Sequence, residues 1–595
     1  MYHIKLKKSI AYALAITMCL SITSTGIMAS AAGTAPEDPP SGSAPGNPSS
    51  GTTQGNPPSG TAPGAPPSGS TPSGGGANTM TYDYTGTLSG ALDADGTAIT
   101  SDKETYEATA TDQTAALVQN SGTLTMTNGT LSKSGDDTNG DNCNFYGINS
   151  ILLAVNNGSM AYISGSSLNA DSEGSNAIFA TDGATVFAND DTITTTAGNS
   201  RGLDATYGGT IVANQMNIST AGDHCASVAT DRGGGSISVA NSTLSTAGSG
   251  SPLLYSTGDI EADNVTGTAS GSQIAGMEGL NTILIHNSSL TSTLTKATAS
   301  DPIADGIIIY QSTSGDAEST TGEAATFQAV NSMLKSAITS GAMFYFTNTR
   351  ANVVLSNTTL DFDSSKANLM TIQGNDSNNW GSAGSNGADV TFTGIGETLN
   401  GNIDVDTISS LNLFLLKNST YTGATSISTN AVNTDVSDAP ITVNLDSTSK
   451  WIVTSNATIT NLNAEDGASI VDENGNTVSV VVNGASVVKG TSEYTVTVTG
   501  NYSTTVTTGS DNELSSSYID RTAFDSYYGT DTTFGENSSE NNAEATTTSQ
   551  ESQTSQIADQ SATYNRSYVI YGIIAAGVLL VGAAVAIGKR KKNGR

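Results

Sequence analysis

Short segments with alternating apolar and polar residues run through the middle of the chain. A period of two over a few residues is typical of β-strands, and no ordered stretch shows a convincing helical period. In three successive segments the alternating apolar positions are Val186 and Ala188, Ile211 and Ala213, and Ile237 and Val239. The pattern therefore predicts an all-β structure in which each strand has one buried face.

These segments repeat with a period near 25 residues. Glycines begin four consecutive units, at Gly158, Gly183, Gly208 and Gly234. An apolar residue follows ten positions later, at Leu168, Ile193, Ile218 and Leu244. A threonine closes each unit, at Thr181, Thr206, Thr230 and Thr257. Three markers that recur over four units indicate a solenoid of stacked repeats.

An Asn-containing tetrapeptide supports the repeat. It occurs as Asn128-Gly129-Thr130-Leu131, Asn241-Ser242-Thr243-Leu244, Asn287-Ser288-Ser289-Leu290, Asn331-Ser332-Met333-Leu334 and Asn357-Thr358-Thr359-Leu360. Asn tolerates the left-handed backbone conformation and can form a hydrogen bond with its neighbour in a stack, while the Leu fills the interior. Several copies match the N-glycosylation sequon, but we interpret them as turns.

Three short strands in each repeat, separated by Gly, Asn, Asp and Ser, describe one coil of a parallel β-helix. Each strand would pair with its equivalent in the next coil, about 4.8 Å away. We predict the helix over residues 114–508, with a C-terminal β cap, and residues 494–498 belong either to the final coils or to this cap. Residues 79–113 are expected to form an N-terminal cap, because an open end would expose unpaired strand edges.

This arrangement resembles the right-handed parallel β-helix proteins, the pectin-lyase-like superfold. It is similar to adhesin-like surface proteins of anaerobic bacteria, over about residues 114–506. The resemblance implies a stiff scaffold that displays loops to an extracellular glycan or protein surface. Many proteins of this superfold are polysaccharide lyases or hydrolases, so a polysaccharide-binding or polysaccharide-degrading protein is the alternative.

The two ends of the chain predict its location. Residues 1–31 read as a secretory signal peptide, with Lys5, Lys7 and Lys8 before an apolar run and a small-residue cleavage site. Residues 568–588 form an uncharged apolar stretch long enough to cross a bilayer, and residues 589–595 form a basic tail. We therefore expect one transmembrane helix, with the bulk of the chain extracellular and the C-terminus cytoplasmic.

The layout of the C-terminus resembles the cell-wall sorting signals of Gram-positive surface proteins, which favours a bacterium of that type. The LPxTG pentapeptide is absent, so sortase cleavage is not expected.

Two low-complexity segments flank the repeats. Residues 32–78 are rich in Pro, Gly and Ser and predict a disordered linker, and residues 509–567 are rich in Ser, Thr and Asn and predict a disordered stalk.

The composition excludes several classes of function. The 595 residues contain 54 Asp and Glu but only 21 Lys and Arg, a formal charge of −33. Removing the signal and the basic tail leaves 13 basic residues and a charge of −41 for the exported part. Such a chain is not a nucleic-acid binder, because phosphate neutralisation needs clustered Lys and Arg. Three Cys and three His argue against a zinc module or a redox enzyme.

Candidate catalytic motifs are weak. The chain has no Gly-His-Gly, and the repeats contain no Arg-x-Lys, so the polygalacturonase-type pattern is absent around Asp136-Asp137 and Asp190-Asp191. Arg201 and Arg232 occupy different repeat registers, so we interpret both as surface charges. We predict no catalytic residue, no cofactor and no enzymatic activity.

Asp223-His224-Cys225 superficially suggests a nucleophile beside a base. Neighbours on a strand point to opposite faces, so we interpret Cys225 as a buried structural thiol. Cys143 lies in a different register, about three coils away, which predicts two free cysteines rather than a disulfide.

Two acidic segments, residues 137–141 and 472–476, resemble fragments of calcium loops. Neither has the spaced ligands and terminal Glu of an EF-hand, so we predict turns and no metal site. Residues 134–144 are polar and fall outside the repeat phase, which predicts a loop that leaves the rod.

Ser219-Thr220 and Ser245-Thr246 fall in register, but a regular Thr-x-Thr array for ice binding does not persist in the sequence. Carbohydrate binding prefers exposed aromatic residues, and Trp380 is the best candidate because its flanks are loop-like. Trp451 alternates with Val453 and is expected in the core.

Overall fold

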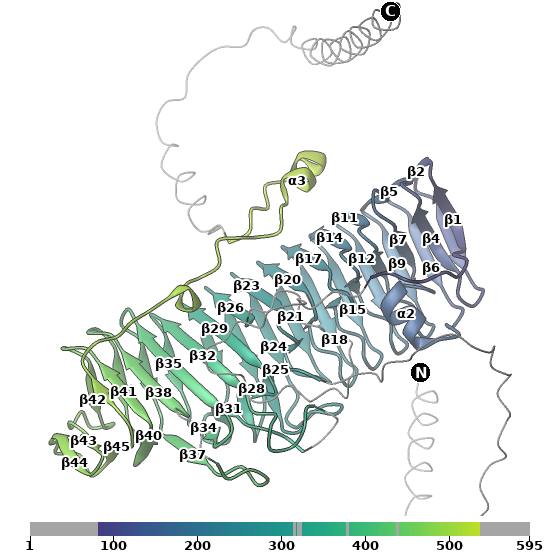
Figure 1. Ribbon diagram of the computed structural model, residues 1–595. Helices are drawn as coiled ribbons and strands as arrows, with labels where there is room; N and C mark the ends of the chain where they lie inside the picture. The colour runs from purple at the N-terminus through teal and green to yellow at the C-terminus, as the bar shows by residue number, and fades with distance from the viewer. Residues whose placement is uncertain (1–80, 313–316, 318–323, 377–379, 436–439, 536–595) are drawn as a thin grey trace, which may run out of the picture. The chain divides into compact units, whose positions relative to one another are not determined.

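The computed structural model describes residues 81–312, 317, 324–376, 380–435 and 440–535. The segments assigned from the sequence to the signal peptide, the linker, the transmembrane helix and the basic tail lie outside these residues. The described chain winds into stacked coils of short parallel strands, which confirms an all-β parallel solenoid (Figure 1).

Three parallel sheets line the sides of the stack. Sheet A contains thirteen strands, in spatial order β1 (Gly90–Asp95), β4 (Thr114–Gln119), β7 (Leu152–Val155), β10 (Ile178–Thr181), β13 (Leu203–Ala205), β16 (Val228–Thr230), β19 (Leu254–Ser256), β22 (Ala275–Glu278), β25 (Asp305–Tyr310), β28 (Ala342–Thr347), β31 (Asn368–Ile372), β34 (Ile403–Asp406) and β37 (Thr425–Ser428).

Sheet B contains fifteen strands, in spatial order β2 (Ala98–Asp102), β5 (Thr123–Thr127), β8 (Met160–Ser164), β11 (Thr185–Asn189), β14 (Thr210–Asn214), β17 (Ser236–Ala240), β20 (Asp259–Asp263), β23 (Thr282–His286), β26 (Ala325–Val330), β29 (Arg350–Ser356), β32 (Asp389–Ile395), β35 (Ser410–Leu416), β38 (Ile441–Leu445), β41 (Asn461–Ala464) and β46 (Tyr502–Ser503).

Sheet C contains ten strands, in spatial order β3 (Thr105–Ala108), β6 (Thr130–Lys133), β9 (Ser167–Ala170), β12 (Thr192–Thr195), β15 (Asn217–Thr220), β18 (Thr243–Thr246), β21 (Thr266–Ala269), β24 (Ser289–Ser292), β27 (Met333–Ser336) and β30 (Thr359–Asp361). Sheet D pairs β33 (Thr398–Asn400), β36 (Thr420–Thr422), β39 (Lys450–Ile452) and β42 (Ser469–Val471). Sheet E contains β40 (Ala457–Ile459), β45 (Thr495–Val498), β43 (Ser479–Val482) and β44 (Ala485–Val488), in that order.

The strand register confirms two of the three repeat markers. The four marker glycines each lie two residues before the first paired positions of β8, β11, β14 and β17. The apolar markers stack directly in sheet C, in the order Leu168, Ile193, Ile218 and Leu244. The third marker slips by one residue, because Thr230 pairs with Ala205 and not with Thr206.

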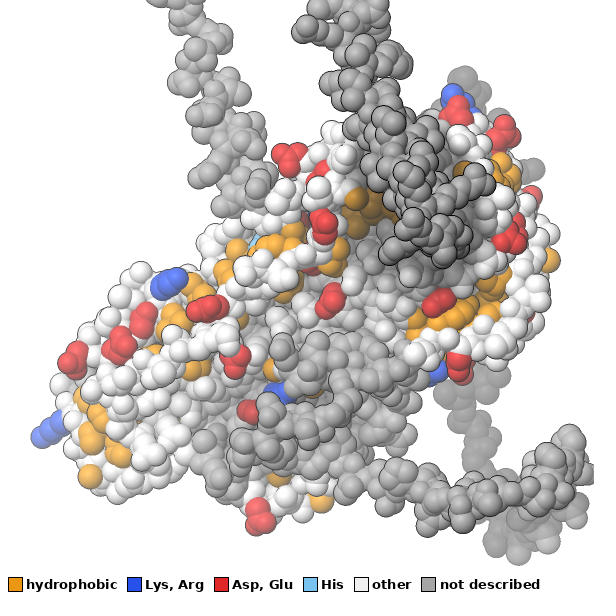
Figure 2. All heavy atoms as spheres, turned by 45° about the horizontal axis from the view of Figure 1, so that its top comes forward, with side chains coloured by type: hydrophobic (Ala, Val, Ile, Leu, Met, Phe, Trp, Pro, Cys, Tyr) orange, Lys and Arg blue, Asp and Glu red, His pale blue; other side chains and the backbone are white. Residues whose placement is uncertain are grey.

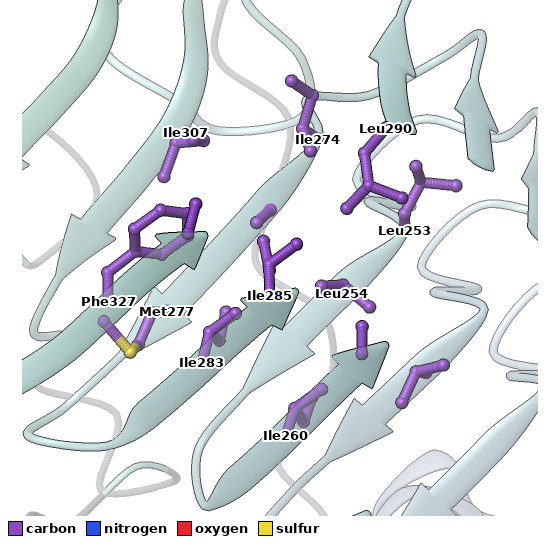
Figure 3. Packing of buried hydrophobic residues seen from close by; sticks show 14 of the residues in the cluster. Leu253, Leu254, Ile260, Ile274, Met277, Ile283, Ile285, Leu290, Ile307 and Phe327 are labelled. Atoms are coloured by element: carbon purple, nitrogen blue, oxygen red, sulfur yellow. The ribbon is translucent and has the colours of Figure 1, made fainter. Parts of the chain in front are cut away.

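The apolar residues of all coils form one continuous core that extends from Leu92 to Val498. Figure 3 shows Ile260, Ile283 and Ile285 packed against Leu254 and Met277 inside the stack. The alternation seen in the sequence therefore places one face of each strand in a shared interior.

The connection from sheet B to sheet C is a two-residue turn in each of the ten coils from β2–β3 to β29–β30, and it explains the Asn tetrapeptides. Its first residue has a positive φ, 50° at Asn241 and 53° at Asn264. The Asn264 amide donates to Asn241 Oδ1 at 2.7 Å, and the Asn241 amide donates to Asn214 Oδ1 at 2.7 Å. These side chains form a ladder along the stack, as the sequence predicted.

The second turn residue forms its own ladder. Ser242 Oγ accepts the Met216 N–H at 2.9 Å, and Ser288 Oγ accepts the Val265 N–H at 3.0 Å. Backbone donors at the corner are thereby satisfied by the next coil. The adjacent Asn and Ser of these tetrapeptides therefore each have a structural role in the turn.

The N-terminal end differs from the predicted cap. Strands β1, β2 and β3 pair in parallel with β4, β5 and β6, so residues 90–108 are themselves a coil of the solenoid. Residues before them lie on the outer face of sheet A, where Tyr82 and Leu88 pack against Leu153 and Phe179. The alternation in residues 90–108 was too polar to be recognised as part of the repeat.

Residues 509–535 do not belong to a disordered stalk. They include the 3₁₀-helix η1 (Ser510–Asn512) and the α-helix α3 (Thr522–Tyr528), and they run back along the outer face of sheet B. We call this segment the strap. It follows one outward-facing row of side chains: Asn512 donates to Thr393 at 2.9 Å, and Ile519 N–H donates to Glu261 at 2.7 Å.

Candidate ligand-binding pocket on sheet A

The outer face of sheet A carries a pocket of about 180 Å³. One row of outward-facing residues, stacked from coil to coil, forms its floor. Gly276 stacks between Tyr255 and Ile308 in this row and contributes no side chain. A Cβ added at Gly276 would have no neighbouring atom nearer than 3.5 Å, so the lack of a side chain there leaves space. The pocket is lined among others by Arg201, Tyr255, Gln273, Asp301, Tyr310 and Trp380.

Long connections border this face and build the walls. Residues 293–304 join β24 to β25, and the described residues 373–376 and 380–388 lie between β31 and β32. The first connection leans on an earlier coil, since the Gly250 N–H donates to Thr298 Oγ1 at 3.0 Å and Thr298 Oγ1 donates to the Gly271 carbonyl at 2.7 Å. Loops held on a rigid scaffold are where binding residues concentrate.

Arg201 is buried at one end of the pocket, so its interpretation as a surface charge was wrong. Its Nη2 lies 3.0 Å from Asp231 Oδ2, and its Nη1 lies 3.4 Å from Asp204 Oδ2. Nη1 also donates to Asn144 Oδ1 at 2.8 Å. Only 8 % of Arg201 is exposed, and an ion with so little water requires such partners. Arg232 is not a plain surface charge either, because its guanidinium lies 3.7 Å from the Phe145 ring centroid.

Asn144 and Phe145 come from the helix α2 (Gly140–Tyr146), which corrects another prediction. Residues 134–144 were expected to loop away from the rod. Instead, the Asn139 side chain caps α2, and Cys143 and Phe145 are buried. The Phe145 carbonyl accepts a hydrogen bond from Thr206 at 2.9 Å, which fixes the helix on sheet A.

A carboxylate bridges two tyrosines on the pocket floor. Glu278 Oε2 accepts hydrogen bonds from the Tyr255 hydroxyl at 2.7 Å and the Tyr310 hydroxyl at 3.0 Å. Ser312 donates to the other carboxylate oxygen. Burial, with the Glu278 charge close by, raises the pKa of both tyrosines well above the usual range, so both remain donors.

A second acidic pair lies at the start of β25, where Asp301 precedes the strand and Asp305 is its first residue. Asp301 lines the pocket, and Asp305 is only 4 % exposed. Burial raises the pKa of Asp301 to about 7. Burial also raises the pKa of Asp305 well above its usual range, and the neighbouring Asp301 charge adds to this effect. Perturbed acids in a cleft are typical of functional sites.

Trp380 is not the exposed aromatic that the sequence suggested. It is 6 % exposed and stacks on Tyr310, with ring centroids 4.3 Å apart and planes at 28°. Asn375 and Asn386 hold its backbone, since both side-chain amides donate to the Trp380 carbonyl. Trp380 is therefore part of the pocket wall. Trp451 is fully buried in the core, as predicted.

Both described cysteines are buried and free, which confirms the prediction for Cys143 and Cys225. Cys225 lies in the turn before β16 rather than within a strand. Its sulfur accepts the Ser200 N–H at 3.0 Å, and its own N–H donates to Ser251 Oγ at 2.9 Å. His224 has a positive φ of 57° and borders the pocket.

The remaining acidic motifs have structural roles. Asp191 is buried at a corner and accepts the Ser166 N–H at 2.7 Å. Asp472 accepts the Asn474 and Asn476 N–H groups, as expected for a turn. Asp136 accepts the Glu173 N–H at 3.0 Å. In the part of the chain that the structure describes, no group of three or more His, Cys, Asp or Glu side chains is arranged to hold a metal ion.

Sheet C presents a different surface. Ser219 stacks on Ser245 and Thr220 on Thr246, as the register predicted, but Thr220 and Thr246 point inward. From β6 to β24 the outward positions are all Ser, Thr or Asn. These are Thr130, Ser132, Ser167, Asn169, Thr192, Thr194, Asn217, Ser219, Thr243, Ser245, Thr266, Thr268, Ser289 and Thr291. Strict Thr-x-Thr pairs occur only in β12 and β21 of this run.

No known family, curated protein or solved structure matches this chain.

Among the described residues, no helix is long and apolar enough to cross a membrane. Acidic side chains are spread over the face seen in Figure 2, and basic ones are few.

Proposed function

We propose that this protein is an adhesin-like display protein of a bacterial cell surface. In this proposal the coils form a right-handed, pectin-lyase-like β-helix that is anchored by residues 568–588 and projects outside the cell. The rod presents the sheet A pocket to an extracellular glycan or protein surface. The observation that carries the proposal is the pocket itself, which lies where long connections interrupt an otherwise regular stack.

The ion pairs at the pocket favour display over catalysis. Charged side chains that meet in a cleft from three or more coils would favour an enzyme. The ion pairs of Arg201 join two coils, because Asp204 shares its coil and Asp231 belongs to the next. Both aspartates are partners of one arginine, an arrangement that is typical of structural ion pairs.

Surface labelling tests the display proposal. We expect an impermeant biotin reagent to label the full chain on intact cells, and a variant lacking residues 568–595 to appear in the medium. A chain found only inside cells would contradict the proposal. Purified full-length protein should bind a glycan or a host protein in a binding screen.

Polysaccharide degradation is the second candidate, and the acidic pair Asp301 and Asp305 favours it. A carboxyl group whose pKa is raised to about 7 can donate a proton near neutral pH, as a general acid must. Incubation with neutral and charged polysaccharides, followed by a reducing-end assay, tests this activity. Product formation that Asp301→Asn abolishes would replace the display proposal.

A further inference from the structure

A groove lies between the strap and the outer face of sheet B, away from the sheet A pocket. Its volume is about 730 Å³, within the range of about 300–1,000 Å³ that is usual for small-molecule sites. Its floor comes from three consecutive strands, β26, β29 and β32, and its wall comes from residues 510–517 of the strap. The groove therefore exists because the strap returns along the sheet.

Hydrogen bonds to sheet B fix the wall in place. Gln328 holds the strap twice, because its amide donates to the Glu513 carbonyl at 3.3 Å and its Oε1 accepts the Ser515 N–H at 2.8 Å. The buried Asn512 side chain donates to Thr393 at 2.9 Å. Gln328 and Thr393 belong to the outward row beneath the strap. The neighbouring outward row, two positions earlier in each strand, forms the floor of the groove.

The floor presents side chains that can bind hydroxyl groups. Thr326, Asn352 and Thr391 stack directly on one another and are half-buried. Within the part of the chain that the structure describes, the side chains of Asn352 and Thr391 form no hydrogen bond. The row continues into the neighbouring coils with Ser, Thr, Asn or Asp at each position, namely Ser236, Asp259, Thr282, Asn412, Thr442 and Asn461. A linear ligand parallel to the rod would therefore meet a polar side chain in every coil, at intervals of about 4.8 Å.

The charges at the groove oppose an anionic ligand. Asp389, Asp511 and Glu513 line it, and among the described lining residues Arg350 is the one basic side chain. Arg350 lies directly beside Asp389 in the stack, so its charge is offset locally. Phosphates and carboxylates are therefore repelled, which argues against nucleic acids and uronic-acid polymers and favours a neutral ligand.

The floor does not favour a peptide. Extended peptides bind a sheet by adding a strand at an unpaired edge, but β26, β29 and β32 are each paired on both sides. Apolar surface for peptide side chains is also limited, because Val354 and Leu514 are the large apolar residues among the described lining residues. Hydroxyls and amides in a straight row instead suit the hydroxyl groups of an extended sugar chain.

We infer that this groove binds an extended, neutral polysaccharide with β-1,4 linkages, which lies parallel to the rod. These linkages keep a chain of glucose, mannose or xylose straight, as the row of floor residues is, whereas α-1,4-linked glucose coils. Asn352 and Thr391 bind sugar hydroxyls from the floor, and Ser516 binds them from the strap. The site is separate from the sheet A pocket, and the inference does not depend on where the chain is located.

Calorimetric titration of the purified full-length chain with cellohexaose, xylohexaose and mannohexaose tests the inference. Two matched ligands accompany cellohexaose. Maltohexaose contains the same sugar with the α-1,4 linkage, and the hexamer of β-1,4-linked glucuronic acid adds a carboxylate to each residue. We expect at least one neutral β-1,4 hexamer to bind about tenfold more tightly than either matched ligand. Binding of none of the three, or equal affinity for the matched ligands, would overturn the inference.

Variants of the floor locate the site. Asn352→Leu and Thr391→Val approximately keep the size of each side chain and remove its hydrogen-bonding group, so each should weaken binding by about threefold to tenfold. Asn217→Leu makes the same change at an exposed outward position of sheet C and should leave the affinity unchanged. Circular dichroism confirms that the variants fold. If the floor variants bind as tightly as the natural chain, the ligand lies elsewhere and the inference is wrong.

A variant of the sheet A pocket distinguishes this inference from the proposed function. Gly276→Met places a side chain in that pocket and should leave cellohexaose binding unchanged. Loss of binding in this variant but not in the floor variants would assign the sugar to the sheet A pocket, which overturns the inference and retains the display proposal. Binding at the groove by a chain that surface labelling finds only inside cells would support the inference and contradict display.

Discussion

The Arg521 guanidinium donates a hydrogen bond to the Ser238 carbonyl oxygen at 2.9 Å, although the two residues are 283 positions apart. Arg521 also donates to Ser238 Oγ, to the Ala213 carbonyl at 3.0 Å and to Thr532 at 2.8 Å. Only 5 % of Arg521 is exposed. This side chain fixes the strap to sheet B.

Loss of Arg521 should therefore destabilise the fold. We expect Arg521→Ala to lower the free energy of unfolding by about 2–4 kcal/mol, because buried acceptors lose their donors. Urea unfolding monitored by circular dichroism measures the change. Lys489→Ala, at an exposed position, is the control and should stay within about 0.5 kcal/mol. Equal stability of both variants would contradict a stabilising role for Arg521.

Removal of the whole strap should expose an apolar surface. Phe524 packs on Phe187 and Val212, which would face water after truncation at residue 508. We expect the truncated chain to bind a hydrophobic dye and to associate, whereas a chain ending at residue 535 should stay monomeric. Sedimentation of the two chains at the same concentration distinguishes them. A truncated chain that remains monomeric and binds no dye would contradict this prediction.

Cys225 should tolerate serine but not valine. Its sulfur occupies a ladder position that Ser200 and Ser251 fill in the adjacent coils. We expect Cys225→Ser to change stability by less than about 1 kcal/mol, since the serine hydroxyl can accept the same hydrogen bond. Cys225→Val should cost about 1–3 kcal/mol, because the Ser200 N–H loses its acceptor. Thermal unfolding of the two variants measures the difference, and a more stable valine variant would contradict it.

Asp191 predicts a pH dependence of stability. Burial raises its pKa from 3.8 to about 8, so the folded protein keeps a proton that the unfolded chain releases near pH 4. The free energy of unfolding should therefore fall as the pH rises from about 4 to about 8, by about 1.4 kcal/mol for each unit of pKa difference. Asp191→Asn should flatten this part of the profile. A variant with the same slope as the natural protein would contradict this assignment.

Two substitutions at Asn241, which has a left-handed backbone, distinguish the backbone and side-chain contributions of this turn to stability. Asn241→Gly keeps the backbone conformation and loses the amide ladder, so we expect a cost of about 1 kcal/mol. Asn241→Val adds the strain of a β-branched residue at a φ of 50° and should cost about 2 kcal/mol more. Chemical unfolding gives both values, and equal costs would exclude backbone strain.

The repeat could be predicted from the sequence because each coil contacts only its neighbours. Leu168 and Ile193 stack since they are one period apart, and the Asn corners recur for the same reason. The strap and the pocket depend on contacts that do not recur from one coil to the next. Tyr528 reaches the Ile163 carbonyl over 365 residues, and Trp380 meets Tyr310 through a long loop. In the strap, a few scattered apolar residues gave too weak a signal to distinguish it from a polar stalk.

The end of the strap determines where mechanical force enters the molecule. After α3 the chain reverses, and the Gly535 N–H donates to Asp263 of β20 at 2.8 Å. Tension on the chain beyond this residue acts at the level of β20, far from the last coil. The load is carried first by the reversed end of the strap and its hydrogen bonds, so the terminal strand β46 is shielded from being peeled off.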